Sequence, residues 1–202
     1  MPETRPIRRK KPTQDRARES RERVLASAAH LFAARGIPDT STNRIAAHAN
    51  MSIGTLYRYF NDKHEIVEIL RTRFLAEVEE TFTAAVLSAV PLPPREAVAT
   101  GLHAIVETLS ARESLVRALS ADATLSGIGL QGLERRLLLL TQAFLLHHLT
   151  AVSTEDLETR AFVMVNAGLS TCLRIALDPP SGLDRDHLVQ ETANLIGGWI
   201  AS

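Results

Sequence analysis

The chain has 202 residues, 45% of them hydrophobic, so it fits one or two domains with a sizeable apolar core. Its zero net charge hides an asymmetry, since residues 1–75 carry 15 Lys and Arg against 8 Asp and Glu, and residues 76–202 carry 8 against 15. A basic first third is expected where one end of a protein meets phosphate. The chain has a single cysteine, Cys172, no apolar run of about 20 residues and no apolar segment after its basic start. We therefore expect no internal disulfide, no membrane span and no signal peptide. We expect a cytoplasmic protein.

Residues 1–14 contain three prolines and five basic residues, which predicts a flexible basic arm. Two interpretations remain open for it. The arm is either a solvated tail, or its basic cluster contacts DNA phosphate or the minor groove, adding affinity with little sequence information. The cluster comprises Arg8, Arg9, Lys10 and Lys11.

A first helix is predicted from about Asp15 to Arg35, with Gly36 ending it. Residues 40–63 then read as a helix-turn-helix. Thr42 is the expected N-cap of a short helix, residues 50–52 form the turn with Asn50 in the left-handed conformation, and Ser52 caps a second helix over 53–60. In that second helix Leu56 and Phe60 face inward, which leaves a polar outer face suited to the major groove.

A long helix is predicted from Lys63 to Ala89, capped by Asn61 and broken by the prolines at 91–94. Its length of about 40 Å would let it act as a rigid lever between two domains. Everything after the break reads as helical except a loop at 126–132. The predicted helices are 95–110, 113–121, 133–152, 155–177 and 184–200.

The last two helices look too apolar for a monomer surface, and small residues such as Gly168 would let another helix approach closely. They predict a four-helix bundle formed by two copies of the chain.

The runs RVLASAAHLFAARG (23–36), TSTNRIAAHA (40–49) and GTLYRYFNDK (54–63) resemble the amino-terminal domain of the tetracycline-repressor (TetR) family of bacterial regulators. Two positions depart from the family pattern. Asn50 stands where the family usually has glycine, and Ile37-Pro38 where an aromatic residue is common. The resemblance implies an all-α fold with a helix-turn-helix domain (15–65) and a helical effector-binding and dimerisation domain (66–202). It also implies dimerisation through the last two helices.

By the same resemblance, the start and outer face of the second motif helix contact DNA. Arg58 is expected to read guanine, Gly54 to let the backbone approach the duplex, and Lys63 to clamp phosphate beside the helix dipole. Alternatives remain for three positions: Tyr57 packing between helices, Thr42 acting only as a cap, and Arg58 being solvated. The full predicted DNA-contact set is Thr40, Thr42, Asn43, Gly54, Thr55, Tyr57, Arg58, Tyr59 and Lys63.

Weaker signals concern a ligand pocket in the second domain. The low aromatic content of 4% does not indicate a stacking cage, so a small to medium apolar effector is the hypothesis. A plain core role is the alternative for every pocket candidate. A metal site is disfavoured, because His147 and His148 point about 100° apart on a helix and lack further ligands at suitable spacing. The pocket candidates are Phe82, His103, Phe144, His147, Phe162, Asn166 and Cys172.

No nucleophile elbow, zinc-protease motif or complete phosphate loop is present, so we expect neither an enzyme nor a cofactor. The predicted function is that of a homodimeric repressor, which an effector releases from a pseudo-palindromic operator. The alternative is a helical protein of the same fold that binds a ligand or a partner protein without specific DNA binding.

Overall fold

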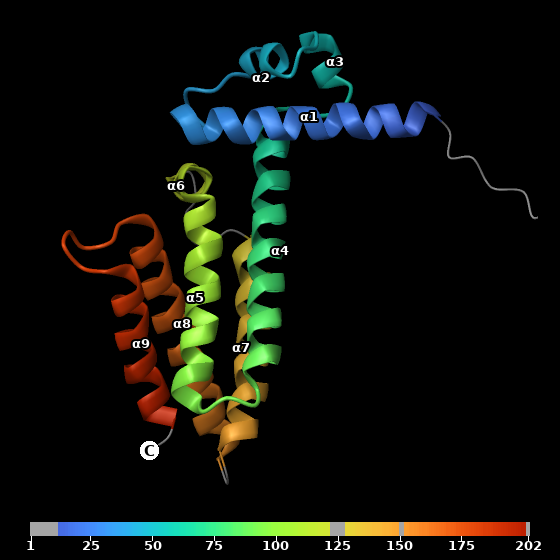
Figure 1. The fold of residues 1–202 in the computed structure, drawn as a ribbon. Helices are drawn as coiled ribbons and strands as arrows, with labels where there is room; N and C mark the ends of the chain where they lie inside the picture. Colours follow the sequence, from blue (N-terminus) through green and yellow to red (C-terminus); the bar gives the residue numbers. More distant parts are fainter. Residues whose placement is uncertain (1–11, 122–127, 150–151, 201–202) are drawn as a thin grey trace, which may run out of the picture. The chain divides into compact units, whose positions relative to one another are not determined.

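The computed structural model describes residues 12–121, 128–149 and 152–200, and within these ranges the chain forms helices and no strand. The predicted all-α fold is confirmed. The chain divides into two compact units, Met1–Leu70 and Arg71–Ser202, with the division inside one continuous helix, α4 (Figure 1). The helices are α1 (Pro12–Arg35), α2 (Thr42–His48), α3 (Ile53–Tyr57), α4 (Lys63–Ala89), α5 (Pro94–Ala111), α6 (Glu113–Ala121), α7 (Ile128–His148), α8 (Thr154–Leu177) and α9 (Arg185–Ile200).

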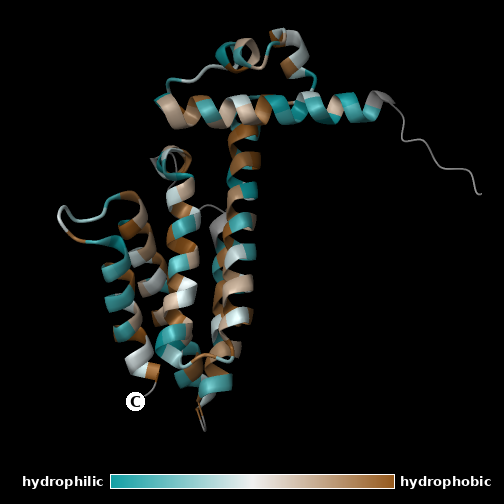
Figure 2. Cartoon of the chain, in the orientation of Figure 1, coloured by the Kyte–Doolittle hydropathy of each residue, from teal (hydrophilic) through white to brown (hydrophobic). Residues whose placement is uncertain are grey.

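In the first unit, α1 has a hydrophilic first half and a more hydrophobic second half (Figure 2). Val24, Leu25 and Phe32 of the second half are buried and form the base on which α2 packs. Gly36 ends the helix in the left-handed conformation at φ 81°, and its N–H donates to the Phe32 carbonyl at 2.8 Å. The helix begins at Pro12, inside the segment predicted as an arm, and the basic cluster at 8–11 lies outside the described residues.

Asp62, not the predicted Asn61, caps α4. The Asp62 carboxylate accepts a bond from the Glu65 N–H at 2.8 Å, and the Glu65 carboxylate accepts from the Asn61 N–H at 2.7 Å. These two carboxylates therefore occupy backbone donors where the positive end of the helix dipole lies.

In the second unit, α5 packs against α8 and α9, and α7 packs against α8. The proline break predicted at 91–94 is confirmed, and α5 starts at Pro94, where the missing N–H has no helical partner to lose. The buried centre of this unit includes Phe144, Leu145, Ala161 and Ile196, contributed by α7, α8 and α9.

The predicted loop at 126–132 is wrong for residues 128–132, because α7 begins at Ile128; residues 126 and 127 lie outside the described part. The same helix ends at His148, short of the predicted 152. Leu133 and Leu137 are buried, and this packing outweighs the low helix propensity of the glycines before them.

Of the described helices, α8 alone is long and apolar enough to cross a membrane by length and composition. A core helix of a soluble protein passes the same test, and one side of α8, with Ala161, Val165 and Cys172, is buried. Gly168 also faces inward, since a Cβ there would lie 3.5 Å from Leu102 of α5. The close neighbour of Gly168 is thus a helix of the same chain, not of a second copy as expected.

Candidate functional site

Two N-caps and one turn residue with a positive φ define the helix-turn-helix. Ser41 caps α2, its side chain accepting from the Arg44 N–H at 3.3 Å, so the predicted cap at Thr42 is off by one residue. Asn50 adopts φ 54°, as expected for the turn. Ser52 caps α3 as predicted, accepting from the Thr55 N–H at 3.1 Å. These bonds fix where each short helix starts.

The second motif helix is shorter than predicted, ending at Tyr57 with Arg58 as its C-cap. The next residues tighten into a turn in which the Arg58 and Tyr59 N–H groups donate to carbonyls three residues back. Leu56 and Phe60 are buried, as expected, and the turn therefore keeps Phe60 in the core while the polar face stays outside.

Tyr57 and Thr42 come together on the outer face, with their hydroxyl oxygens 3.1 Å apart. Tyr57 is 51% exposed, so its ring is not a core residue. Arg58 is exposed beside it, and Thr55 is half-buried with its hydroxyl 2.8 Å from that of Ser52. The first residue of α2, together with α3 and its capping residues, thus presents hydroxyl groups and a guanidinium, which are groups that bind phosphate and base edges.

Gly54 is exposed, and a Cβ at that position would have only the Ser52 hydroxyl within 4 Å, at 3.9 Å. Packing within the protein does not require glycine there. The close approach of an external molecule to the backbone remains a reason for it.

Thr40 does not suit the phosphate contact predicted for it. Its side chain is fully buried, and its hydroxyl donates to the Gly36 carbonyl at 2.8 Å. It stabilises the loop after α1 and is a structural residue.

Lys63 is half-buried and donates from Nζ to the Ile37 carbonyl at 2.7 Å. The bond joins the start of α4 to the loop after α1. An ammonium has three N–H donors, so two remain for the predicted phosphate contact. The helix dipole should stabilise a bound phosphate less than expected, because the Asp62 and Glu65 carboxylates already accept from backbone N–H groups at the same helix end.

Asn43 is exposed on α2 and Tyr59 is half-buried after α3, so both remain available as predicted contacts. Sequence reasoning missed Arg44, an exposed cation on α2 whose guanidinium donates to the Asp39 carbonyl at 2.9 Å. Residues 40–63 contain only three Lys and Arg side chains, and two of them, Arg58 and Lys63, were already predicted to contact DNA. Arg44 is the third, so the sequence alone could have identified it as a candidate.

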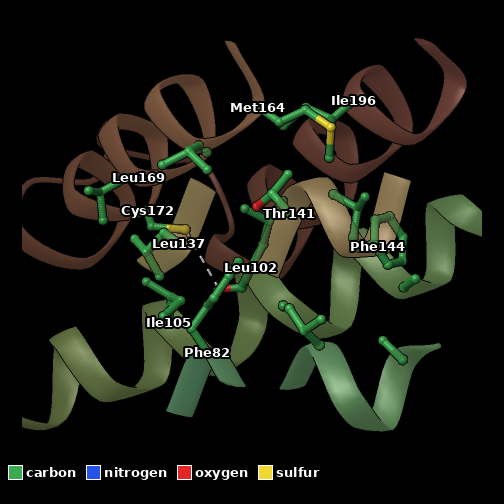
Figure 3. Close-up of a pocket in the computed structure, with 17 residues that line it drawn as sticks. Phe82, Leu102, Ile105, Leu137, Thr141, Phe144, Met164, Leu169, Cys172 and Ile196 are labelled. Carbon is green, nitrogen blue, oxygen red and sulfur yellow. Dashed lines mark hydrogen bonds between the residues drawn. The ribbon is translucent and has the colours of Figure 1, made fainter. Parts of the chain in front are cut away.

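The second unit contains a cavity of about 90 Å³ between α4, α5, α7, α8 and α9 (Figure 3). Its wall is almost entirely hydrocarbon, and the side-chain exceptions are the Thr141 hydroxyl, the Cys172 thiol and the Met164 thioether sulfur. Burial raises the pKa of the Cys172 thiol to about 12, and the sulfur lies 3.7 Å from the Leu102 carbonyl oxygen. The lining residues are Phe82, Val86, Ala89, Ala97, Val98, Gly101, Leu102, Ile105, Leu137, Thr141, Phe144, Met164, Val165, Gly168, Leu169, Cys172 and Ile196.

Of the seven candidate ligand contacts, Phe82, Phe144 and Cys172 line this cavity, whereas the other four do not. Phe162, Asn166 and His147 are exposed, because the faces of α8 and α7 that carry them turn away from the cavity. His103 lies on α5 with its ring 3.8 Å from the Asp186 carboxylate. These four predictions are wrong for this cavity.

His147 and His148 meet edge to face with their ring centres 5.0 Å apart. Within the described residues no three His, Cys, Asp or Glu side chains gather in a way that would hold a metal ion.

Two family models match the chain. The model for bacterial regulatory proteins of the tetR family matches residues 24–70, and the model for the tetracyclin repressor-like C-terminal domain matches residues 93–198. The first match lies within the first unit of the structure and the second match within the second unit.

Among proteins of known sequence, the uncharacterized HTH-type transcriptional regulator TtgW of Pseudomonas putida is 33% identical over 67 residues, a third of this chain. The chain spans half the length of that relative. A TetR-like regulator from Rhodococcus sp. RHA1 superposes with a TM-score of 0.63 at 23% identity, covering 91% of this chain and 96% of that one.

The structure of AibR in complex with isovaleryl coenzyme A and operator DNA superposes with a TM-score of 0.56 at 19% identity, over 87% of this chain and 97% of that chain. At these identities the structural matches establish the fold. The C-terminal family model alone spans more than half of the chain, and with the amino-terminal model it identifies the chain as a member of the TetR family of bacterial transcriptional regulators.

Proposed function

We propose that this chain is a dimeric, sequence-specific DNA-binding regulator that represses transcription until a small apolar effector releases it from a pseudo-palindromic operator. The observation that carries the proposal is the polar outer face of the helix-turn-helix. There Thr42 and Tyr57 share a hydrogen bond, and Arg58 is exposed next to them.

We expect this face to make two kinds of contact with DNA, to base edges and to phosphates. Arg58 is the residue for base readout, since a guanidinium bonds guanine O6 and N7 in a bidentate manner. Thr42, Tyr57 and Lys63 position the domain on phosphates, and Arg44 joins them as an additional cation. The basic balance of residues 1–75 supports the same assignment.

Dimerisation through α8 and α9 is supported by apolar side chains that a single chain leaves on its surface. Phe162 and Val163 on α8 are 54% and 46% exposed, and Leu195 and Trp199 on α9 are 76% and 37% exposed. Both helices also bury an inner face, so they are apolar on two sides. A second copy of the chain would cover the outer face.

Regulation would act through α4, which continues from the first unit into the second and contributes Phe82, Val86 and Ala89 to the cavity wall. An effector that binds one arrangement of the cavity helices better than another shifts the population toward it. Through α4 this shift would change the separation of the two DNA-reading helices of the dimer. The fold is that of AibR, described in complex with isovaleryl coenzyme A and operator DNA, and this supports both ligand and DNA binding here. The protein would act in the cytoplasm, where the chromosome lies.

The test is selection of bound duplexes from a random DNA pool by the purified full-length protein. We expect an enriched inverted repeat whose half-sites are about one helical turn, 34–36 Å, or a multiple of it apart. The Arg58→Ala variant should lose preference at one or two base pairs in each half-site, by about 1–3 kcal/mol each.

The competing function is a helical ligand- or partner-binding protein without specific DNA recognition. It would give no enriched sequence, and the residual binding to duplexes would disappear as salt rises. That result would overturn the proposal.

A further inference from the structure

The cavity of the second unit is neutral as well as apolar. None of its lining residues is Lys, Arg, His, Asp or Glu. The Thr141 side chain is 4% exposed, and Cys172 is 2% exposed with its thiol directed to the Leu102 carbonyl. The raised pKa of that thiol keeps it protonated near neutral pH. A charged ligand group would therefore lose its hydration without finding an opposite charge.

One wall of the cavity is kept open by a glycine inside a helix. Gly101 lies in the middle of α5, and a Cβ built on it would have no atom within 4 Å. Glycine is a poor helix former, and neither crowding nor a positive φ requires it here. Because Gly101 lines the cavity and a Cβ there would meet open space, we expect a larger side chain at this position to occupy part of the cavity.

The size of the cavity limits its ligand. At about 90 Å³ it is of the same order as apolar cavities of about 150 Å³ that stay dry and bind benzene. A single ring fits this range, whereas a long acyl chain with a nucleotide does not.

We propose that the cavity binds a compact, uncharged, single-ring hydrocarbon or its alcohol, with Thr141 bonding the ligand hydroxyl and Gly101 providing the room for the ring. The proposal names the chemical class of the effector in the proposed function. It rests on that function only for what binding causes, namely release from DNA. An acyl-coenzyme A of the kind named for AibR carries phosphates, and the lining has no cation to meet them.

Binding is tested on the full-length protein without DNA, by isothermal titration calorimetry with three ring compounds: cyclohexanol, benzene and cyclohexanecarboxylate. Cyclohexanol and benzene should bind, and the carboxylate at pH 7.5 should bind at least about 100-fold more weakly than cyclohexanol because its charge is buried unpaired. Equal binding of the carboxylate, or binding of none of the three, overturns the proposal. Because no operator is present, failure here is separate from failure of DNA recognition.

Variants locate the site. Gly101→Leu should weaken binding of both neutral rings at least about 30-fold by occupying their space. The matched control is Gly132→Leu, since Gly132 lies on α7, is exposed, and likewise has no atom within 4 Å of a Cβ. This control should bind both rings as the parent does, and equal loss in both variants would overturn the assignment.

Thr141→Val keeps the shape of the side chain and removes its hydroxyl. It should weaken cyclohexanol about 3- to 10-fold while benzene binding stays within about twofold. This difference between two ligands remains informative if Gly101→Leu fails to fold, which thermal unfolding of each variant would reveal first. Unchanged cyclohexanol binding in Thr141→Val would remove Thr141 from the site.

Discussion

Lys63 has two roles to fill with one ammonium group. It holds the loop after α1 through the Ile37 carbonyl, at 2.7 Å, and in the proposed complex it also contacts a DNA phosphate. The two roles are compatible because the ammonium has three N–H donors. A substitution of Lys63 should therefore affect both the stability of the domain and its affinity for DNA.

Replacing Lys63 by Met should therefore reduce both properties. Loss of the half-buried charged hydrogen bond should lower the free energy of unfolding by about 1–2 kcal/mol, measured by urea denaturation. Loss of one phosphate contact should weaken all duplexes alike and reduce the slope of log affinity against log salt by about 0.9. The control is Arg135→Met, an exposed cation on α7. A Lys63→Met protein with normal stability and an unchanged salt slope would remove Lys63 from both roles.

At the scale of elements, the turn between α2 and α3 depends on Asn50, the single non-glycine residue with positive φ among the described residues. Asparagine tolerates this conformation, while β-branched side chains do not. Asn50→Val should destabilise the protein by about 1–2 kcal/mol, whereas Asn50→Gly should be near neutral. Thermal unfolding measures both, with Asn43→Val on α2 as the control for loss of an exposed asparagine. Equal effects of Val and Gly at position 50 would show that the backbone conformation is not the cause.

Local signals predicted several elements well, because caps and breaks are encoded by neighbouring residues. The start of α3 after Ser52 and the start of α5 at the proline break follow from such signals. The start of α7 was missed, since burial of Leu133 and Leu137 is a tertiary effect that overrides the glycines nearby.

The DNA-facing surface and the cavity were likewise predicted only where local sequence decides the structure. Exposure of Arg58 and burial of Leu56 follow from helical periodicity in a short motif. Which residues line the cavity depends instead on which side of an apolar helix faces inward. On α8, Met164 faces the cavity and Phe162 does not, and both sides of that helix are apolar in sequence. The sequence pattern alone does not distinguish two apolar faces, one for the core and one for a partner.

For the whole molecule, the proposed function requires two copies of the chain, because one motif helix reads only a half-site. A two-fold interface uses the same residues from both copies, so each substitution acts twice. Leu195, which is 76% exposed on α9, is the best probe of that interface, since its side chain contributes little to the fold of a single chain.

Leu195→Glu should convert the protein to monomers without unfolding it. Burying an unpaired carboxylate costs at least about 2 kcal/mol for each copy, so the dimer should weaken by about 4 kcal/mol, close to a thousandfold. Sedimentation equilibrium measures the assembly, and Leu139→Glu is the matched control, because Leu139 is a 60% exposed leucine on α7, outside the proposed interface. The monomer should lose affinity for the full operator while binding a half-site duplex as weakly as the parent does. A Leu195→Glu protein that remained dimeric, or a Leu139→Glu protein that dissociated equally, would move the interface away from α9.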